Sequence, residues 1–507
     1  MRPISVCLVA ALAAAPPQPA RTTSARDIVS RSIEAMGGEA ALKSISTLQI
    51  EAIGHDFFIE QSERPEGPFI PRYTQSSEKR DVAGGRSRIE TQQRYAQVPD
   101  WAGAGSAVIV DGDAAIMNRG DRFAPAGRPA FEDGRERLEL APERLLFTAL
   151  AAPDLAAAPD DRVHGIVQRA VTFTWRGHKA RLLIDSGDFI PTALDLYLPD
   201  TWGVWGTVRN TTYFSQWSLL PGGVRYPMQT DRDVNGASKA SASIMKIAVN
   251  QPLDAALFAI PADARAAFAA LPTASRWDLL KLDPDQQRIE VEPGKVVQYG
   301  GNWNVGVVRQ SDGLVILEAP ISSPYSIQVL DEMAKRYPGA KIKAVVTTSD
   351  AWPHIGGIRE YVARGIPIYA LDLNQPILER LLKADHSARP DALAKAPKAP
   401  RFTWVSGKSV VGDGDTRMEI YPLRGENGER MLMVYFPALK LLYTSDDIMP
   451  SRGGGFFMPQ TLIEVREAIK RERLQVDRIF GFHIGPTPWS AIEAAIASSS
   501  APSPPGR

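Results

Sequence analysis

The chain has 507 residues, of which 44% are hydrophobic and 23% charged, a composition typical of globular proteins that excludes a mainly disordered or fibrous chain. Its 58 basic and 58 acidic residues leave no net charge, so no general excess of positive charge favours nucleic acid or an anionic membrane as a partner. At roughly 100–200 residues per domain, the length predicts two to four domains.

The N-terminus has the pattern of a secretory signal peptide. A basic residue, a short apolar run and small residues follow one another over residues 1–20, and the run is shorter than the about 20 apolar residues of a spanning helix. The only cysteine, Cys7, lies inside this run. We therefore predict a signal peptide over residues 1–25, no transmembrane anchor, and an exported protein, periplasmic or extracellular, whose mature part lacks disulfides. A leader that is not cleaved is the alternative.

Strand patterns dominate residues 26–262. Two short helices, broken at Gly37 and Gly38, precede segments that alternate in polarity or are rich in β-branched and aromatic residues, as antiparallel strands covered on one face are. We expect strands over residues 48–54, 107–113, 171–175, 180–185, 193–198, 211–217, 224–227 and 242–247. The sequence thus predicts one antiparallel β domain.

The turns of this β domain, at 184–191, 220–227 and 250–254, give it a resemblance to bacterial lipoprotein-carrier domains. The resemblance implies a half-open β-barrel around an apolar cavity, which would take a lipid or another apolar ligand. A barrel filled by its own side chains is the alternative.

After an alanine-rich connector over residues 263–285, strands and helices alternate over residues 286–495, which predicts an α/β domain. Strands are expected at 296–301, 304–308, 313–318, 341–348, 366–370, 417–421, 430–436, 440–443 and 478–481, and helices at 322–337, 355–364, 375–384 and 462–473. A disordered tail is expected over residues 496–507.

Four segments of this second domain resemble the signature segments of the metallo-β-lactamase superfamily, in the same order along the chain: 345–358, 431–437, 442–446 and 479–486. The resemblance implies an αββα sandwich, in which metal ligands on the loops at one edge activate a water for hydrolysis.

The ligand pattern of that family is incomplete here. The family's loop reads His-x-His-x-Asp-His, but its first three ligand positions hold Ser349, Ala351 and Pro353, and only the last histidine is present, as His354. A further ligand histidine is missing near Asn427. These side chains are not the imidazoles or carboxylates that zinc normally uses.

The ligands that remain are His354, Asp446 and His483, which the resemblance places at the second metal position and the bridge. Two imidazoles and one carboxylate form an accepted catalytic set, so we predict one divalent metal, preferably zinc, with Asp350 as a possible additional ligand. The alternative is that no metal binds and that the three residues serve the structure.

Two functions follow from these observations. The first is a divergent hydrolase of the cell envelope with a single-metal site, acting on an ester, lactone or amide; its catalytic groups are not assigned. The second is a catalytically inactive pseudo-enzyme that serves as a ligand-binding or envelope-assembly module. The expected partner is a small-molecule substrate or an apolar ligand, and not nucleic acid. The glycine-rich segment 453–457 is either a lid or a plain connector.

Overall fold

The computed structural model of the chain describes residues 24–59, 70–95, 98–119, 122–301, 303–451, 454–456 and 458–499. Most of the predicted signal peptide, most of the predicted tail and parts of segment 453–457 therefore lie outside the described residues. No helix among the described residues is long and apolar enough to cross a membrane.

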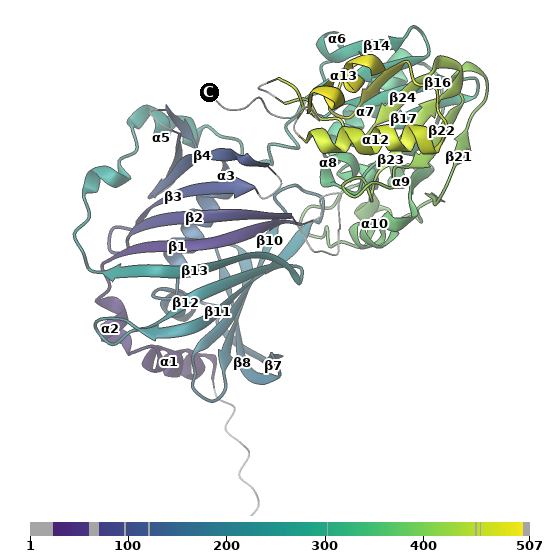
Figure 1. Cartoon of the computed structure of the whole chain (residues 1–507). Coiled ribbons are helices and arrows are strands. Elements are labelled where there is room, and N and C mark those ends of the chain that lie inside the picture. Colours follow the sequence, from purple (N-terminus) through teal and green to yellow (C-terminus); the bar gives the residue numbers. More distant parts are fainter. Residues whose placement is uncertain are drawn as a thin grey trace, which may run out of the picture.

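The N-terminal part is built on one antiparallel sheet of thirteen strands in the order β6-β5-β4-β3-β2-β1-β13-β12-β11-β10-β9-β8-β7, and this sheet is strongly curved (Figure 1). Its strands are β1 (Thr47–Phe58), β2 (Ile70–Asp81), β3 (Arg86–Tyr95), β4 (Val98–Asp111), β5 (Ala114–Arg119), β6 (Arg122–Pro125), β7 (Ala156–Val163), β8 (Ile166–Trp175), β9 (His178–Asp185), β10 (Pro191–Pro199), β11 (Thr207–Leu219), β12 (Arg225–Val234) and β13 (Ala237–Val249).

Helices cover one face of this sheet. They are α1 (Ala25–Ala35), α2 (Glu39–Lys43), α3 (Arg128–Glu139) and α4 (Leu145–Ala151). Val29 of α1 and Leu145 of α4 belong to the same buried cluster as Phe173 of β8, and Phe131 of α3 packs with Val110 of β4. The protein's own apolar side chains therefore occupy much of the face where an apolar ligand was expected, and binding of such a ligand stays a prediction.

A fully buried ion-pair cluster lies on the same face. Arg80 of β2 donates from Nη1 to Glu143 Oε1 at 2.6 Å and from Nη2 to Glu78 Oε1 at 2.8 Å. The Tyr226 hydroxyl donates to the second oxygen of Glu143 at 3.2 Å. Burial opposes the charge of Arg80, but the two carboxylates outweigh it and raise the pKa of the guanidinium further. The interior of the sheet is therefore stabilised by paired charges as well as by apolar packing.

The substitution Arg80→Met should lower the free energy of unfolding by about 3–5 kcal/mol, because the buried Glu143 loses its cation and Glu78 keeps only Arg137, whose Nη1 lies 3.8 Å from Glu78 Oε2. Arg169→Met is the matched control: Arg169 pairs with Asp160 at 2.5 Å, but both side chains are 43% exposed, and such pairs contribute about 0–1 kcal/mol. Urea unfolding followed by circular dichroism measures both values. Equal losses in the two variants would contradict the role given to Arg80.

A connector with η1 (Ala255–Phe258), α5 (Ala262–Ala269) and α6 (Pro284–Gln287) leads to two further sheets. The seven-stranded sheet contains β14 (Arg288–Glu292), β15 (Val296–Tyr299), β16 (Val305–Gln310), β17 (Gly313–Leu317), β18 (Ile342–Val346), β19 (Ile368–Leu371) and β20 (Phe402–Val405). The six-stranded sheet contains β21 (Ser409–Val411), β22 (Met418–Pro422), β23 (Leu432–Phe436), β24 (Leu441–Thr444), β25 (Arg478–Gly481) and β26 (Thr487–Pro488).

These two sheets form the inner layers of a mixed α/β structure. A buried cluster joins them, with Val315 and Val346 from one sheet and Val434 and Phe480 from the other. Helices lie outside the two sheets (Figure 1). The helices that contribute to the buried cluster beside the seven-stranded sheet, or lie near it, are α7 (Ser323–Arg336), α8 (Trp352–Ile355), α9 (Ile358–Ala363), α10 (Gln375–Leu382) and α11 (Ala392–Lys395). The helices that cover the six-stranded sheet are α12 (Pro459–Arg471) and α13 (Trp489–Ser499). The predicted domain boundaries near residues 262 and 285 stay a prediction.

The two halves of the chain meet through tryptophans. Trp202, in the loop between β10 and β11, stacks on Trp352 of α8 with ring centroids 3.9 Å apart, and Trp277 and Trp303 pack on the same ring. Beside them Thr207 N donates to Asp385 O at 2.8 Å. A β-domain loop therefore packs directly against the short helix that carries His354.

His386, next to this contact, has a lowered pKa because of burial and the nearby Arg359 guanidinium, which together outweigh Asp391. Its imidazole is thus held neutral, whereas the unfolded chain takes up a proton below about pH 6.5. Stability should therefore fall as the pH drops through this value, and His386→Gln should remove that part of the fall. Unfolding midpoints at pH 7.5 and 5.5 test this, and an equal fall in both proteins would contradict it.

Candidate functional site

His354 lies in α8, a four-residue helix that follows β18 after a short buried loop. Its side chain has no exposed surface, and its ring stacks on Phe482 with centroids 3.6 Å apart. The helix begins at Trp352, so Asp350 precedes it and does not share a helical turn with His354. Asp350 is fully buried, and its role as an additional ligand stays a prediction.

The structure brings together the three residues expected from the sequence. His354 Nε2 lies 2.9 Å from Asp446 Oδ1, and His483 Nε2 lies 2.8 Å from the same oxygen. Asp446 follows β24 and His483 follows β25, and these two strands are parallel neighbours, so their carboxyl ends meet at one edge of the sheet. Two imidazoles from different loops therefore converge on one carboxylate.

A fourth residue, Glu318, was not identified from the sequence. It follows β17, is fully buried, and its Oε2 lies 3.0 Å from His354 Nδ1. Thr348 and Tyr443 also donate hydrogen bonds to this carboxylate. The backbone of Glu318 has a φ of 83°, a value that non-glycine residues rarely adopt outside functional or strained sites. Glu318, His354, Asp446 and His483 thus form one continuous chain of contacts, here called the carboxylate–imidazole chain.

The charged groups of the carboxylate–imidazole chain stabilise one another's ionised forms. Burial by itself lowers the pKa of His354, but the carboxylates of Asp446 and Glu318 on its two sides raise it to about 10. Burial likewise disfavours the charge of Asp446, but His354 and His483 hold the pKa of its carboxyl well below the usual range. His354 is therefore a buried cation between two carboxylates.

A second acidic group lies beside the chain. Asp447 is 2% exposed, and burial together with Glu464 and Asp446 raises the pKa of its carboxyl well above the usual value. Glu464 accepts hydrogen bonds from the backbone and side chain of Asn427, the residue near which the family's missing histidine was expected. Asn427 is thus held by Glu464.

The carboxylate–imidazole chain carries the kinds of donor atom that a divalent metal takes. The donor set of two imidazoles and one carboxylate suits zinc, and a carboxylate such as Glu318 on the far nitrogen of a histidine is a usual support of a metal ligand. The residues fit the metal on donor type.

In the arrangement described, the same atoms are hydrogen-bonded to one another. Within the described ranges, no group of three or more histidine, cysteine, aspartate or glutamate side chains is arranged to hold a metal ion. His354 and His483 nevertheless meet at a single oxygen, Asp446 Oδ1.

The carboxylate–imidazole chain is partly exposed at one end, as far as the described residues show. The side chains of Asp446 and His483 are 18% and 14% exposed, whereas those of His354 and Glu318 are completely buried. Among the described residues of the carboxylate–imidazole chain, Asp446 and His483 are therefore the ones that solvent or a substrate can reach.

No family model and no curated protein matches the sequence. Among solved structures, similarity was found to the sec-alkylsulfatase Pisa1 from Pseudomonas sp. (17% identity, 41% of this chain, 40% of that chain, TM-score 0.32) and to a metallo-β-lactamase from Pontibacter korlensis (13% identity, 41% and 95%, TM-score 0.31). A LolA superfamily protein from Nitrosomonas europaea is also similar (10% identity, 47% and 98%, TM-score 0.32).

The chain therefore spans less than half of the alkylsulfatase, and it is similar to two different kinds of structure. None of these TM-scores exceeds 0.32, so the similarities say nothing about the chemistry of the site. What the site can do chemically follows from its own residues.

Glu318→Gln should lower the free energy of unfolding by about 3–5 kcal/mol, because the buried His354 cation loses a carboxylate and an amide NH₂ then faces hydrogen-bond donors. Glu290→Gln, at an exposed position, is the control and should change stability by less than about 0.5 kcal/mol. Denaturant unfolding of both variants measures the difference. A Glu318→Gln protein as stable as the control would show that the carboxylate–imidazole chain contributes little to the stability of the protein.

Proposed function

We propose that the C-terminal part of the chain is a divergent hydrolase of the metallo-β-lactamase fold whose site is reduced to one divalent metal, preferably zinc. His354, Asp446 and His483 would hold the metal, and the substrate class is an ester, lactone or amide of the cell envelope. Export to the periplasm or the extracellular space is part of the proposal and rests on the N-terminal sequence pattern.

The observation that carries the proposal is the convergence of two imidazole nitrogens on one carboxylate oxygen, at 2.8 and 2.9 Å. Four ligand positions of the family pattern hold other residues, yet the three that remain come from three separate loops and meet at one point. A divalent metal, when bound, would supply Lewis acidity and lower the pKa of a water.

The residues around the proposed metal would have distinct roles. Glu318 fixes the orientation of the His354 ring through Nδ1, which leaves Nε2 directed at Asp446. Phe482 stacks on the same ring and excludes water from its buried side. A carbonyl substrate would approach from the partly exposed Asp446 and His483 end.

The second candidate is an inactive binding or envelope-assembly module. It is favoured by the contacts within the carboxylate–imidazole chain, because His354 is hydrogen-bonded to Asp446 through Nε2 and lies 3.0 Å from Glu318 through Nδ1, so that two carboxylates flank its ring without a metal. In this case the carboxylate–imidazole chain would serve to hold the two inner sheets together.

Elemental analysis of untagged protein after incubation with zinc and desalting separates the two candidates. The proposal predicts close to one zinc per chain, lost in His354→Ala and in His483→Ala, because each variant removes one of only three ligands. His178→Ala, which removes an imidazole of β9 in the N-terminal sheet, is the matched control and should keep the metal.

Absence of zinc from the unmodified protein, or zinc retained in both site variants, would overturn the proposal. In the first case the inactive module becomes the better account.

A further inference from the structure

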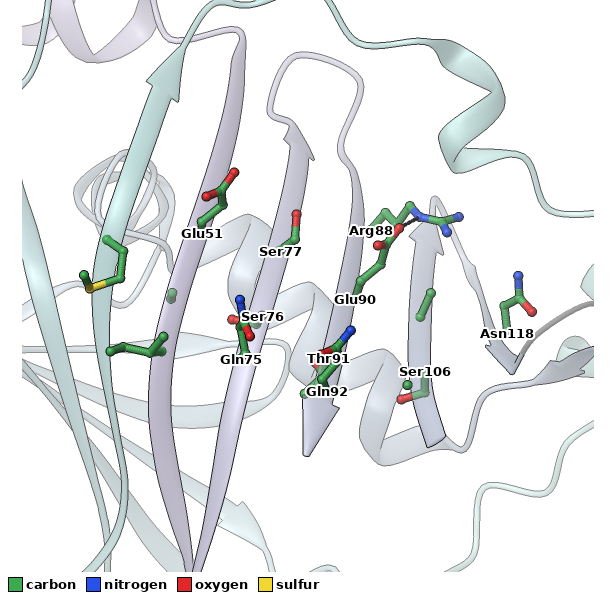
Figure 2. Close-up of a pocket in the computed structure, with 15 residues that line it drawn as sticks. Glu51, Gln75, Ser76, Ser77, Arg88, Glu90, Thr91, Gln92, Ser106 and Asn118 are labelled. Carbon is green, nitrogen blue, oxygen red and sulfur yellow. Dashed lines mark hydrogen bonds and ion pairs between the residues drawn. The ribbon is translucent and has the colours of Figure 1, made fainter. Parts of the chain in front are cut away.

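The β domain has a shallow trough on its outer face that the proposed hydrolase site does not use. Two adjoining hollows of about 470 and 730 Å³ are lined by strands β1–β5 and β13, and they share Ile53, Gln75, Gln92 and Gly105. Figure 2 shows the residues that line the first of them. Because they share these residues, they form one continuous depression across the strands, and its size is that of sites for small ligands.

The strand register places this trough on the face opposite the helices. Ile53 of β1 pairs with Gln75 of β2, and Gln75 pairs with Gln92 of β3, so the three side chains point to the same side. Ile50, at the opposite parity on β1, faces the buried cluster with helices α1 and α4. The trough is therefore separate from the helix-covered face where a lipid was expected.

Most charged groups in the trough are already paired. Arg88 Nε donates to Glu90 Oε1 at 2.8 Å (Figure 2), and Glu51 lies 3.8 Å from Lys246. Arg94, at one end, is the exception. A strongly charged ligand would find little net charge to complement along the rest of the trough.

Besides the imidazole of His55, the polar side chains that remain are amides and hydroxyls. Among the described residues, the side chains of Gln75 and Gln92 have no hydrogen-bond partner, and both are exposed. Ser241 and Ser243 of β13 line the same trough and add two hydroxyls. Planar amides that both donate and accept are suited to hydroxyl groups, which also do both.

Apolar surface lies among these polar groups. Tyr73 is 54% exposed and Ile53 is 49% exposed, and both line the hollow shared with Gln75 and Gln92. An exposed aromatic ring beside amide groups is complementary to a ligand that is apolar on one side and polar at its edge. A sugar ring has this character, with C–H groups on its faces and hydroxyls around it.

We propose that the trough binds a glycan chain. Gln75 and Gln92 contact its hydroxyls, and Tyr73 packs against the face of one sugar ring. The paired charges disfavour a polyphosphate, and the amide-rich lining disfavours an acyl chain. The proposal is independent of the metal site.

Isothermal titration calorimetry of the full chain with soluble hexasaccharides tests this, using cello-, chito- and malto-hexaose and a peptidoglycan-derived glycan of similar length as probes. The proposal predicts binding of at least one probe and a loss of at least about tenfold in affinity in the Gln75→Ala/Gln92→Ala double variant, because two hydrogen bonds are removed. Tyr73→Ala should weaken binding similarly.

Gln286→Ala, at an exposed position of α6 outside the trough, is the matched control and should bind as the unmodified protein does. Because Gln75, Gln92 and Tyr73 are all exposed, these variants should fold, and circular dichroism checks that they do.

No binding of any probe at millimolar concentration would overturn the proposal, as would binding that the trough variants leave unchanged. Self-association that the double variant abolishes, seen by analytical ultracentrifugation, would assign the trough to a second copy of the chain and overturn it as well.

Discussion

The contact between the buried His354 ring and the carboxylates on its two sides determines how the C-terminal half is organised. Glu318 follows a strand of the seven-stranded sheet, whereas Asp446 and His483 follow strands of the six-stranded sheet. A buried imidazolium is tolerated only with such partners, because one unpaired charge in this position would cost several kcal/mol. The same contact therefore joins the two sheets and aligns the three residues proposed to hold a metal.

The regular, strongly patterned elements could be predicted from the sequence. The two N-terminal helices separated at Gly37 and Gly38, and the strand and helix alternation after residue 286, have the expected types with end points that differ by a few residues. The helix expected from residue 355 begins only at Ile358, since α8 ends at Ile355 and Gly356 and Gly357 intervene.

Strands β2 and β3 were not predicted, and neither were helices α3 and α4. In β2 the outward residues, such as Gln75, line the polar trough, while Glu78 and Arg80 on the other side form buried ion pairs. The sequence is therefore polar on both faces and lacks the alternation that marks a strand covered on one side. Pairing of charges inside the sheet is a tertiary effect that a single sequence does not display.

At the candidate site, the resemblance gave three residues that the fold brings together, but it missed Glu318. The sequence carries one indication of it: a lone acidic residue directly after the apolar strand β17, where a charge requires a buried partner. The contact of Trp202 with Trp352 was also missed, because it joins residues 150 positions apart and has no local pattern.

The central claim is that His354, Asp446 and His483 act as one ligand set. The zinc K-edge X-ray absorption spectrum of the untagged protein, loaded with one equivalent of zinc, tests it most directly. The account predicts two imidazole ligands and additional oxygen ligands at about 2.0–2.2 Å. A spectrum with oxygen ligands only, or zinc that remains free in solution, would contradict it.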